Sequence, residues 1–176
     1  MHNPTTSQLG VVAPGIRVPP AARGLYAIEY REVFRLVAPP EQLWAGMERV
    51  ERFEEWWGWL RDLRLEGPGL SAGSVLSGVI SPPLPYRMRV RVVVQECIRP
   101  KVIGAAIHGD LEGEARLVFD PEGDGTRASV AWTIEMMQRS MRLAAVVAAP
   151  LLRWGHDRVV ESTVAEFDRH VGHDNS

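Results

Sequence analysis

The sequence predicts a single α+β domain in which a curved antiparallel sheet of about seven strands wraps around a long C-terminal helix. One strand pattern is followed by two short helices, then by about six strand patterns separated by turns, and finally by a long amphipathic helix. Strands that follow one another without intervening helices pair in antiparallel fashion. A chain of 176 residues, 45% of them hydrophobic, is long enough to bury one core of ordinary size.

The first strand and the short helices are expected within residues 26–57. Apolar and charged residues alternate over residues 26–37, which is typical of a strand with one face exposed to water. Two prolines followed by Glu41 suit a helix start, because proline fits the first turn and a carboxylate favours the positive end of the helix dipole. Apolar residues then recur at helical spacing at Leu43, Met47, Val50 and Trp57. We expect one or two short amphipathic helices that end near Trp57.

Six further strand patterns lie between these helices and the C-terminal helix. They cover residues 60–66, 74–80, 86–96, 101–108, 114–119 and 126–137. In the third of them Arg87, Arg89 and Arg91 alternate with apolar residues, so that three guanidinium groups share one face. We expect this face to be exposed and to keep the sheet soluble, rather than to bind nucleic acid.

The chain is expected to end in a helix over residues 151–171. Its apolar stripe contains one histidine and consists of Leu152, His156, Val159, Thr163 and Phe167. Residues 1–24 contain four prolines and no secretory signal pattern, so we expect a flexible arm there. Residues 25–172 then form a single domain, and residues 173–176 form a short tail.

Composition narrows the classes of function. A formal net charge of −2 provides no overall field that would attract nucleic acid. The single cysteine, Cys97, excludes a disulfide framework and a cysteine-rich zinc site, and it suits a reducing, cytoplasmic setting. The five histidines lack metal-ligand spacing and no phosphate-binding loop occurs, so we expect neither a metal nor another cofactor. The most apolar run, residues 143–152, is about half the length of a membrane span.

Several segments together resemble the polyketide cyclase and START-like superfamily. They are APPEQLW (38–44), WWGWLRDLRL (56–65), PLPYRMRVRVVV (83–94), HGDLEGEARL (108–117), DGTRASVAW (124–132) and WGHD (154–157). The resemblance covers residues 26–171 and implies the helix-grip fold of that superfamily. Its members typically hold hydrophobic or aromatic small molecules between the sheet and the last helix, and some cyclise or dehydrate polyketides. The resemblance therefore implies a cavity, whereas no common set of catalytic residues comes with it.

The residues expected to line this cavity are mainly apolar and aromatic side chains of the strands and of the last helix. They are Trp57, Met88, Val92, His108, Trp132, Ile134, Met136, Leu152, His156 and Val159. Tryptophan rings suit stacking on an aromatic ligand, although the same rings also suit core packing. His108 is expected at one mouth of the cavity, with an exposed turn position as the alternative.

His156 is the candidate catalytic residue, because an imidazole gains or loses a proton near neutral pH. It could act as an acid or base on an enolisable carbonyl, with Glu32, Glu96 or Tyr30 as a partner. Glu96 shares strand parity with Val94 and would then point inward. The alternative is a core histidine that hydrogen-bonds a strand carbonyl.

Three functions are open at this point. The leading prediction is the binding of a small hydrophobic molecule, which is aromatic, polyketide-like or lipid-like, by a monomer or homodimer with no membrane span and no nucleic-acid partner. The second is polyketide cyclase or dehydratase chemistry in the same cavity, with His156 as acid or base. The third is a protein-interaction module with a filled core.

Overall fold

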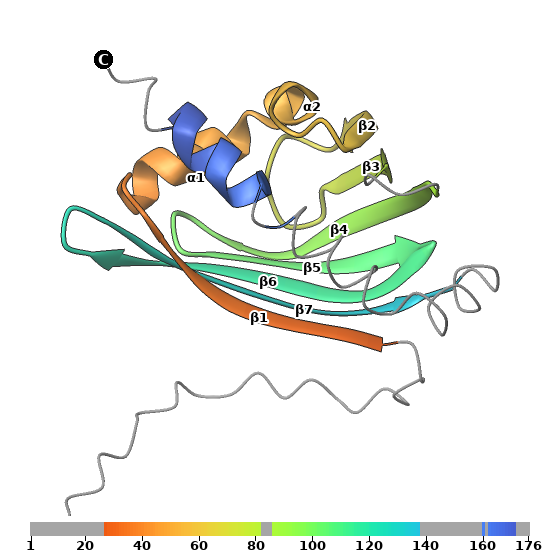
Figure 1. The fold of residues 1–176 in the computed structure, drawn as a ribbon. Coiled ribbons are helices and arrows are strands. Elements are labelled where there is room, and N and C mark those ends of the chain that lie inside the picture. The colour runs from red at the N-terminus through yellow and green to blue at the C-terminus, as the bar shows by residue number, and fades with distance from the viewer. Residues whose placement is uncertain (1–26, 82–85, 138–159, 161, 172–176) are drawn as a thin grey trace, which may run out of the picture.

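The computed structural model describes residues 27–81, 86–137, 160 and 162–171. Seven strands form one antiparallel sheet in the order β1-β7-β6-β5-β4-β3-β2 (Figure 1). They are β1 (Ala27–Leu36), β2 (Leu60–Glu66), β3 (Val75–Ile80), β4 (Met88–Ile98), β5 (Val102–Gly109), β6 (Leu111–Glu122) and β7 (Gly125–Met136). Strands β2 to β7 follow one another as neighbours, and β1 completes the sheet beside β7. The predicted α+β class and curved antiparallel sheet are confirmed.

Three short helical segments connect β1 to β2. They are α1 (Pro40–Glu48), a 3-10 turn (Val50–Arg52) and α2 (Phe53–Trp56). Pro40 occupies the first turn of α1 and Glu41 follows it, as the sequence pattern predicts. A C-terminal helix contains residues 160 and 162–171, and it lies on the same side of the sheet as α1 and α2 (Figure 1). The expected start of that helix, near residue 151, lies outside the described residues.

The alternation of side chains gives the sheet an inner face, toward the helices, and an outer face. One inner row crosses five strands and contains Tyr30, Trp132, Ala115, Ala105 and Val94. The main core joins inner residues of the sheet to residues of α1, α2 and the C-terminal helix. Its buried members are Leu36, Ala38, Leu43, Trp44, Val50, Phe53, Trp56, Trp57, Leu60, Phe119, Ala128, Phe167 and Val171. Both expectations for β1, an apolar inner face and a wet outer face, agree with its burial pattern.

Glu96, for which strand parity left an inward position open, does not point inward, because β4 contains a β-bulge. Val94 lies opposite Ala105, whereas Glu96 lies opposite Gly104, so two residues of β4 advance the register by only one residue of β5. The extra residue inverts the alternation, because side chains on a strand change face at every residue. Glu96 therefore lies on the outer face, where it forms an ion pair with Arg116.

Hydrogen bonds fasten the C-terminal helix to the α1 and α2 region. The indole Nε1 atoms of Trp57 and Trp59 donate to the backbone oxygen and the hydroxyl of Thr163, at 3.2 and 3.0 Å. Gln42 donates to the carbonyl oxygen of Val171 at 2.6 Å. A Cβ atom added to Gly46 would lie 2.5 Å from Cγ2 of Val171, so the absence of a side chain there lets the two helices meet closely.

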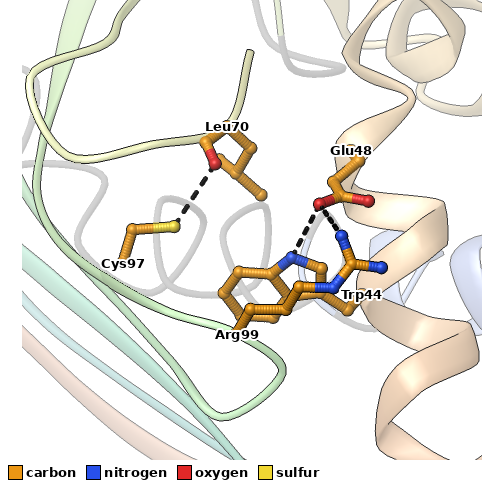
Figure 2. A network of polar contacts seen from close by, with 5 residues as sticks. All are labelled: Trp44, Glu48, Leu70, Cys97 and Arg99. Atoms are coloured by element: carbon orange, nitrogen blue, oxygen red, sulfur yellow. Dashed lines mark hydrogen bonds and ion pairs between the residues drawn. The ribbon is translucent and has the colours of Figure 1, made fainter. Parts of the chain in front are cut away.

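A polar network ties α1 to the turn between β4 and β5 (Figure 2). One carboxylate oxygen of Glu48 accepts from Trp44 Nε1 at 3.1 Å and from Arg99 Nη1 at 2.5 Å. Nearby, the Cys97 thiol donates to the carbonyl oxygen of Leu70 at 3.4 Å. Burial and, secondarily, the charge of Glu48 raise the pKa of this thiol, which keeps it protonated and poorly nucleophilic.

The close contact at Gly46 predicts a stability defect in Gly46→Leu. The added side chain must displace Val171 and Phe167, and overpacking of this kind costs about 1–3 kcal/mol in the free energy of unfolding. Urea denaturation measures the change. Gly58→Leu is the matched control, because an added Cβ meets nothing within 4 Å there. Equal stability of the two variants would contradict the close contact between α1 and the C-terminal helix at Gly46.

Candidate functional site

A second apolar cluster lies on the inner face, and it contains no residue of the described helices. Its buried members are Met88, Leu111, Ile134 and Met136, and its partly buried members are Ile28, Ile80, Tyr86, Val90, Ile107 and Trp132. By contrast, the main core contains residues of α1, α2 and the C-terminal helix. The inner face therefore has one part packed against helices and another apolar part that no described helix covers.

Five residues that sequence analysis assigns to the cavity share this inner face. Met88, Ile134, Met136 and Trp132 belong to the second cluster. Val92 is half-buried and lies opposite Ile107, another member of the cluster. The strand register thus places side chains of β4 and of β7 on the same face of the sheet.

Tyr30 and Trp132 form a stacked aromatic pair on the inner face, and Trp132 belongs to the second cluster. They lie opposite each other on β1 and β7, and their rings stack with centroids 4.3 Å apart and an interplanar angle of 17°. Stacked rings are held by both area burial and their complementary charge distribution. An aromatic wall at this position could contact a planar ligand.

Tyr86 is a cluster member that sequence analysis did not single out. It packs against the second cluster just before β4 begins. Desolvation raises the pKa of its phenol, so the hydroxyl stays protonated and can donate a hydrogen bond. The parity that Tyr86 shares with Met88 and Val90 was the available signal.

Trp57 and His108 lie away from the second cluster. Trp57 belongs to the main core, where its ring lies 4.5 Å from that of Phe53 and its indole donates to Thr163. His108 lies opposite Arg91 on the outer face, and its side chain is 48% exposed. The structure thus separates these two residues from the five inner-face candidates.

Of the candidate acid and base residues, two lie on the inner face. Tyr30 and Glu32 are two residues apart on β1 and point to the same side of the sheet. Glu32 is exposed, and its carboxylate accepts from the backbone of Val33 at 3.3 Å. His156, Leu152 and Val159 lie outside the described residues, so their expected positions on the last helix stay predictions.

The described residues contain no group of three or more His, Cys, Asp or Glu side chains arranged to hold a metal ion. No helix within the same ranges is long and apolar enough to cross a membrane.

On the outer face, Glu112 is held by two donors. The backbone N–H of Gly109 donates to one of its oxygens at 2.9 Å, and His108 Nδ1 lies 2.9 Å from the other. The Gly109 hydrogen bond and, after it, the His108 contact lower the pKa of Glu112. This interaction favours the folded state above the ordinary pKa of glutamate, and its contribution is lost as the pH falls through the lowered value.

Comparison with known protein families gives one match over most of the chain. Residues 27–172 match the family described as polyketide cyclase / dehydrase and lipid transport. No curated protein matches the sequence significantly.

Solved structures share the fold at low sequence identity. Protein TTHA0849 from Thermus thermophilus is 20% identical with a TM-score of 0.69, and the match covers 85% of this chain and all of that one. A conserved protein from Geobacillus kaustophilus is 9% identical with a TM-score of 0.68, over 82% of this chain and 95% of that one. The di-domain ARO/CYC protein StfQ from the steffimycin biosynthetic pathway is 10% identical with a TM-score of 0.66, over 85% of this chain and 52% of that one.

Because two groups contact the Glu112 carboxylate, we can predict how its pKa responds when one of them is removed. In His108→Ala the pKa of Glu112 should stay below its ordinary range, because the Gly109 N–H is the larger cause of the lowering. A carboxyl-carbon NMR titration of the wild type and the variant measures both values. A return to the ordinary glutamate pKa in His108→Ala would show that the histidine is the dominant cause.

Proposed function

The chain belongs to the polyketide cyclase / dehydrase and lipid transport family, and from this premise we propose that it binds a small hydrophobic molecule between the inner face of the sheet and the C-terminal helix. The molecule is aromatic, polyketide-like or lipid-like. The observation that supports the proposal most directly is the second cluster, whose buried and half-buried apolar residues have no described helix against them. Concave apolar surfaces with a few polar groups are the usual form of small-molecule sites.

Burial of ligand surface provides most of the affinity in this proposal. Each Å² of apolar area removed from water contributes roughly 25 cal/mol, so affinity should increase with the apolar area of the ligand. A planar ligand could extend the stacked pair of Tyr30 and Trp132. The methionines of the cluster, Met88 and Met136, adapt their shape readily and would tolerate ligands of several shapes.

A few polar groups would set the orientation of the ligand. The Tyr86 hydroxyl forms no hydrogen bond with another described residue, and it stays protonated because its pKa is raised. It can therefore donate to a ligand carbonyl or hydroxyl. His156 is proposed as a second orienting group, on the helix side of the cavity. A cytoplasmic location and a monomeric or homodimeric state complete the proposal.

Val92 and Val93 provide a matched test, because they are adjacent on β4 and point to opposite faces. Val92→Phe should weaken the binding of the fluorescent probe 1-anilinonaphthalene-8-sulfonate about tenfold or more, since the larger ring occupies inner space next to Ile107. Val93→Phe should bind as the wild type does. Fluorescence titration measures both, and thermal unfolding shows that each variant is folded. Equal affinities in the two folded variants would contradict an inner site.

Cyclase or dehydratase chemistry in the same cavity is the second candidate. Tyr30 and Glu32 favour it, because both present dissociable groups on the inner face beside Trp132. In a dehydration, His156 would remove a proton next to a carbonyl, and Tyr30 or Glu32 would protonate the departing hydroxyl, which leaves as water. Structural similarity to an ARO/CYC protein is consistent with such chemistry and shows the fold alone.

The catalytic proposal is tested with a β-hydroxy ketone whose dehydration product absorbs light. His156→Ala should abolish turnover while substrate affinity stays within about tenfold of the wild type, because the base is lost and the apolar walls remain. Glu32→Gln, assayed in parallel, should lower the rate if Glu32 is the acid and leave it unchanged if Tyr30 is. A normal rate in His156→Ala would reject the histidine as the base.

A further inference from the structure

A shallow, open groove crosses the outer face of the sheet, on the side opposite the second cluster. It has a volume of about 550 Å³ and spans β2 to β5. The residues that line it include Asp62, Arg64, Ser77, Arg89, Arg91 and His108. We call this surface the arginine groove. The sheet itself separates it from the proposed ligand cavity, so the two sites are independent.

The strand register concentrates basic side chains in this groove. Arg64 lies opposite Ser77, Ser77 lies opposite Arg91, and Arg91 lies opposite His108. These four residues form one row across four neighbouring strands. Arg89 precedes Arg91 by two residues, so it points to the same face.

The positive charge of the groove is only partly neutralised within the described residues. Three exposed guanidinium groups face one carboxylate, Asp62, and the described part of the chain offers no ion pair to Arg64, Arg89 or Arg91. Glu112 is already engaged by His108 and Gly109. Asp110 accepts from the backbone N–H of Arg89 at 2.7 Å rather than from its guanidinium group.

Some other arginines of the described residues do have acidic partners. Arg35 pairs with Glu122, Arg99 with Glu48, and Arg116 with Glu96. The described C-terminal helix lies on the opposite, inner side of the sheet (Figure 1). The arginine groove is therefore suited to receive negative charge from another molecule.

We propose that the arginine groove docks an acidic helix of a protein partner. A shallow, open surface suits a macromolecule better than an enclosed small ligand, and arginine is enriched at protein interfaces. Residues two apart on a strand are separated by about 7 Å, and residues two strands apart by about 10 Å. Carboxylates at positions i, i+4 and i+7 of a helix are separated by about 6 and 10.5 Å along its axis. A helix that lies across the strands thus matches the Arg64 to Arg91 spacing with its i and i+7 carboxylates, and Arg89 lies about 7 Å to one side of that line.

The test uses the full chain and a fluorescently labelled helical peptide with Glu at i, i+4 and i+7 of one face. Anisotropy titration at low ionic strength should show saturable binding, and the matched peptide with Gln at these positions should not bind. Arg64→Ala combined with Arg91→Ala should weaken binding about tenfold, because each exposed charge pair contributes about a factor of three. Added salt should weaken it further.

Arg31→Ala combined with Arg127→Ala is the control. Both residues are exposed on the outer face, on β1 and β7, so the change in net charge is the same at a distance from the groove. This double variant should bind the Glu peptide as the wild type does. Equal losses in both double variants, no saturable binding, or equal binding of the Gln peptide would overturn the proposal. Tighter binding of a single-stranded oligothymidylate than of the Glu peptide would also overturn it.

Discussion

The need to cover one apolar face of a seven-stranded antiparallel sheet determines most of this structure. The main core forms where sheet residues such as Leu36, Phe119 and Ala128 meet the helices. Close packing at Gly46 and the indole hydrogen bonds to Thr163 seat the C-terminal helix over that part of the sheet. The second cluster occupies the remainder of the inner face. The proposed binding site lies there, where no described helix belongs to the cluster, and no dedicated motif marks it.

In β4 the alternation of side chains between the two faces of the sheet separates apolar residues from arginines. Met88, Val90 and Val92 face inward, while Arg89 and Arg91 face outward, and each set continues across neighbouring strands through the register. Because consecutive side chains on a strand point to opposite faces, an apolar inner wall and a charged outer row can be encoded in one short segment. The sheet keeps the proposed hydrophobic ligand and the proposed acidic partner apart.

The sequence was sufficient to predict the element order, the helix start at Pro40 and the inner orientation of Val92, Trp132 and Ile134. These features depend on local patterns, namely the spacing of apolar residues and the preference of proline for the first turn of a helix. The orientation of Glu96 was not predictable, because a β-bulge appears only in the pairing of β4 with β5. The hydrogen bond from Trp57 to Thr163 joins residues far apart in the chain, so no local pattern indicates that Trp57 seats a helix. Tyr86 shares parity with Met88, so its inner position follows from the same local pattern.

The central claim is that the inner face holds a small hydrophobic molecule, and native mass spectrometry of the purified full chain tests it most directly. Apolar sites of this kind retain ligands from the host, because dissociation re-exposes apolar surface to water. The account predicts a stoichiometric adduct that denaturing extraction releases as an aromatic, polyketide-like or lipid-like compound. Protein masses without any adduct, together with no thermal stabilisation by aromatic and lipid-like compounds, would contradict the claim and favour a filled interior.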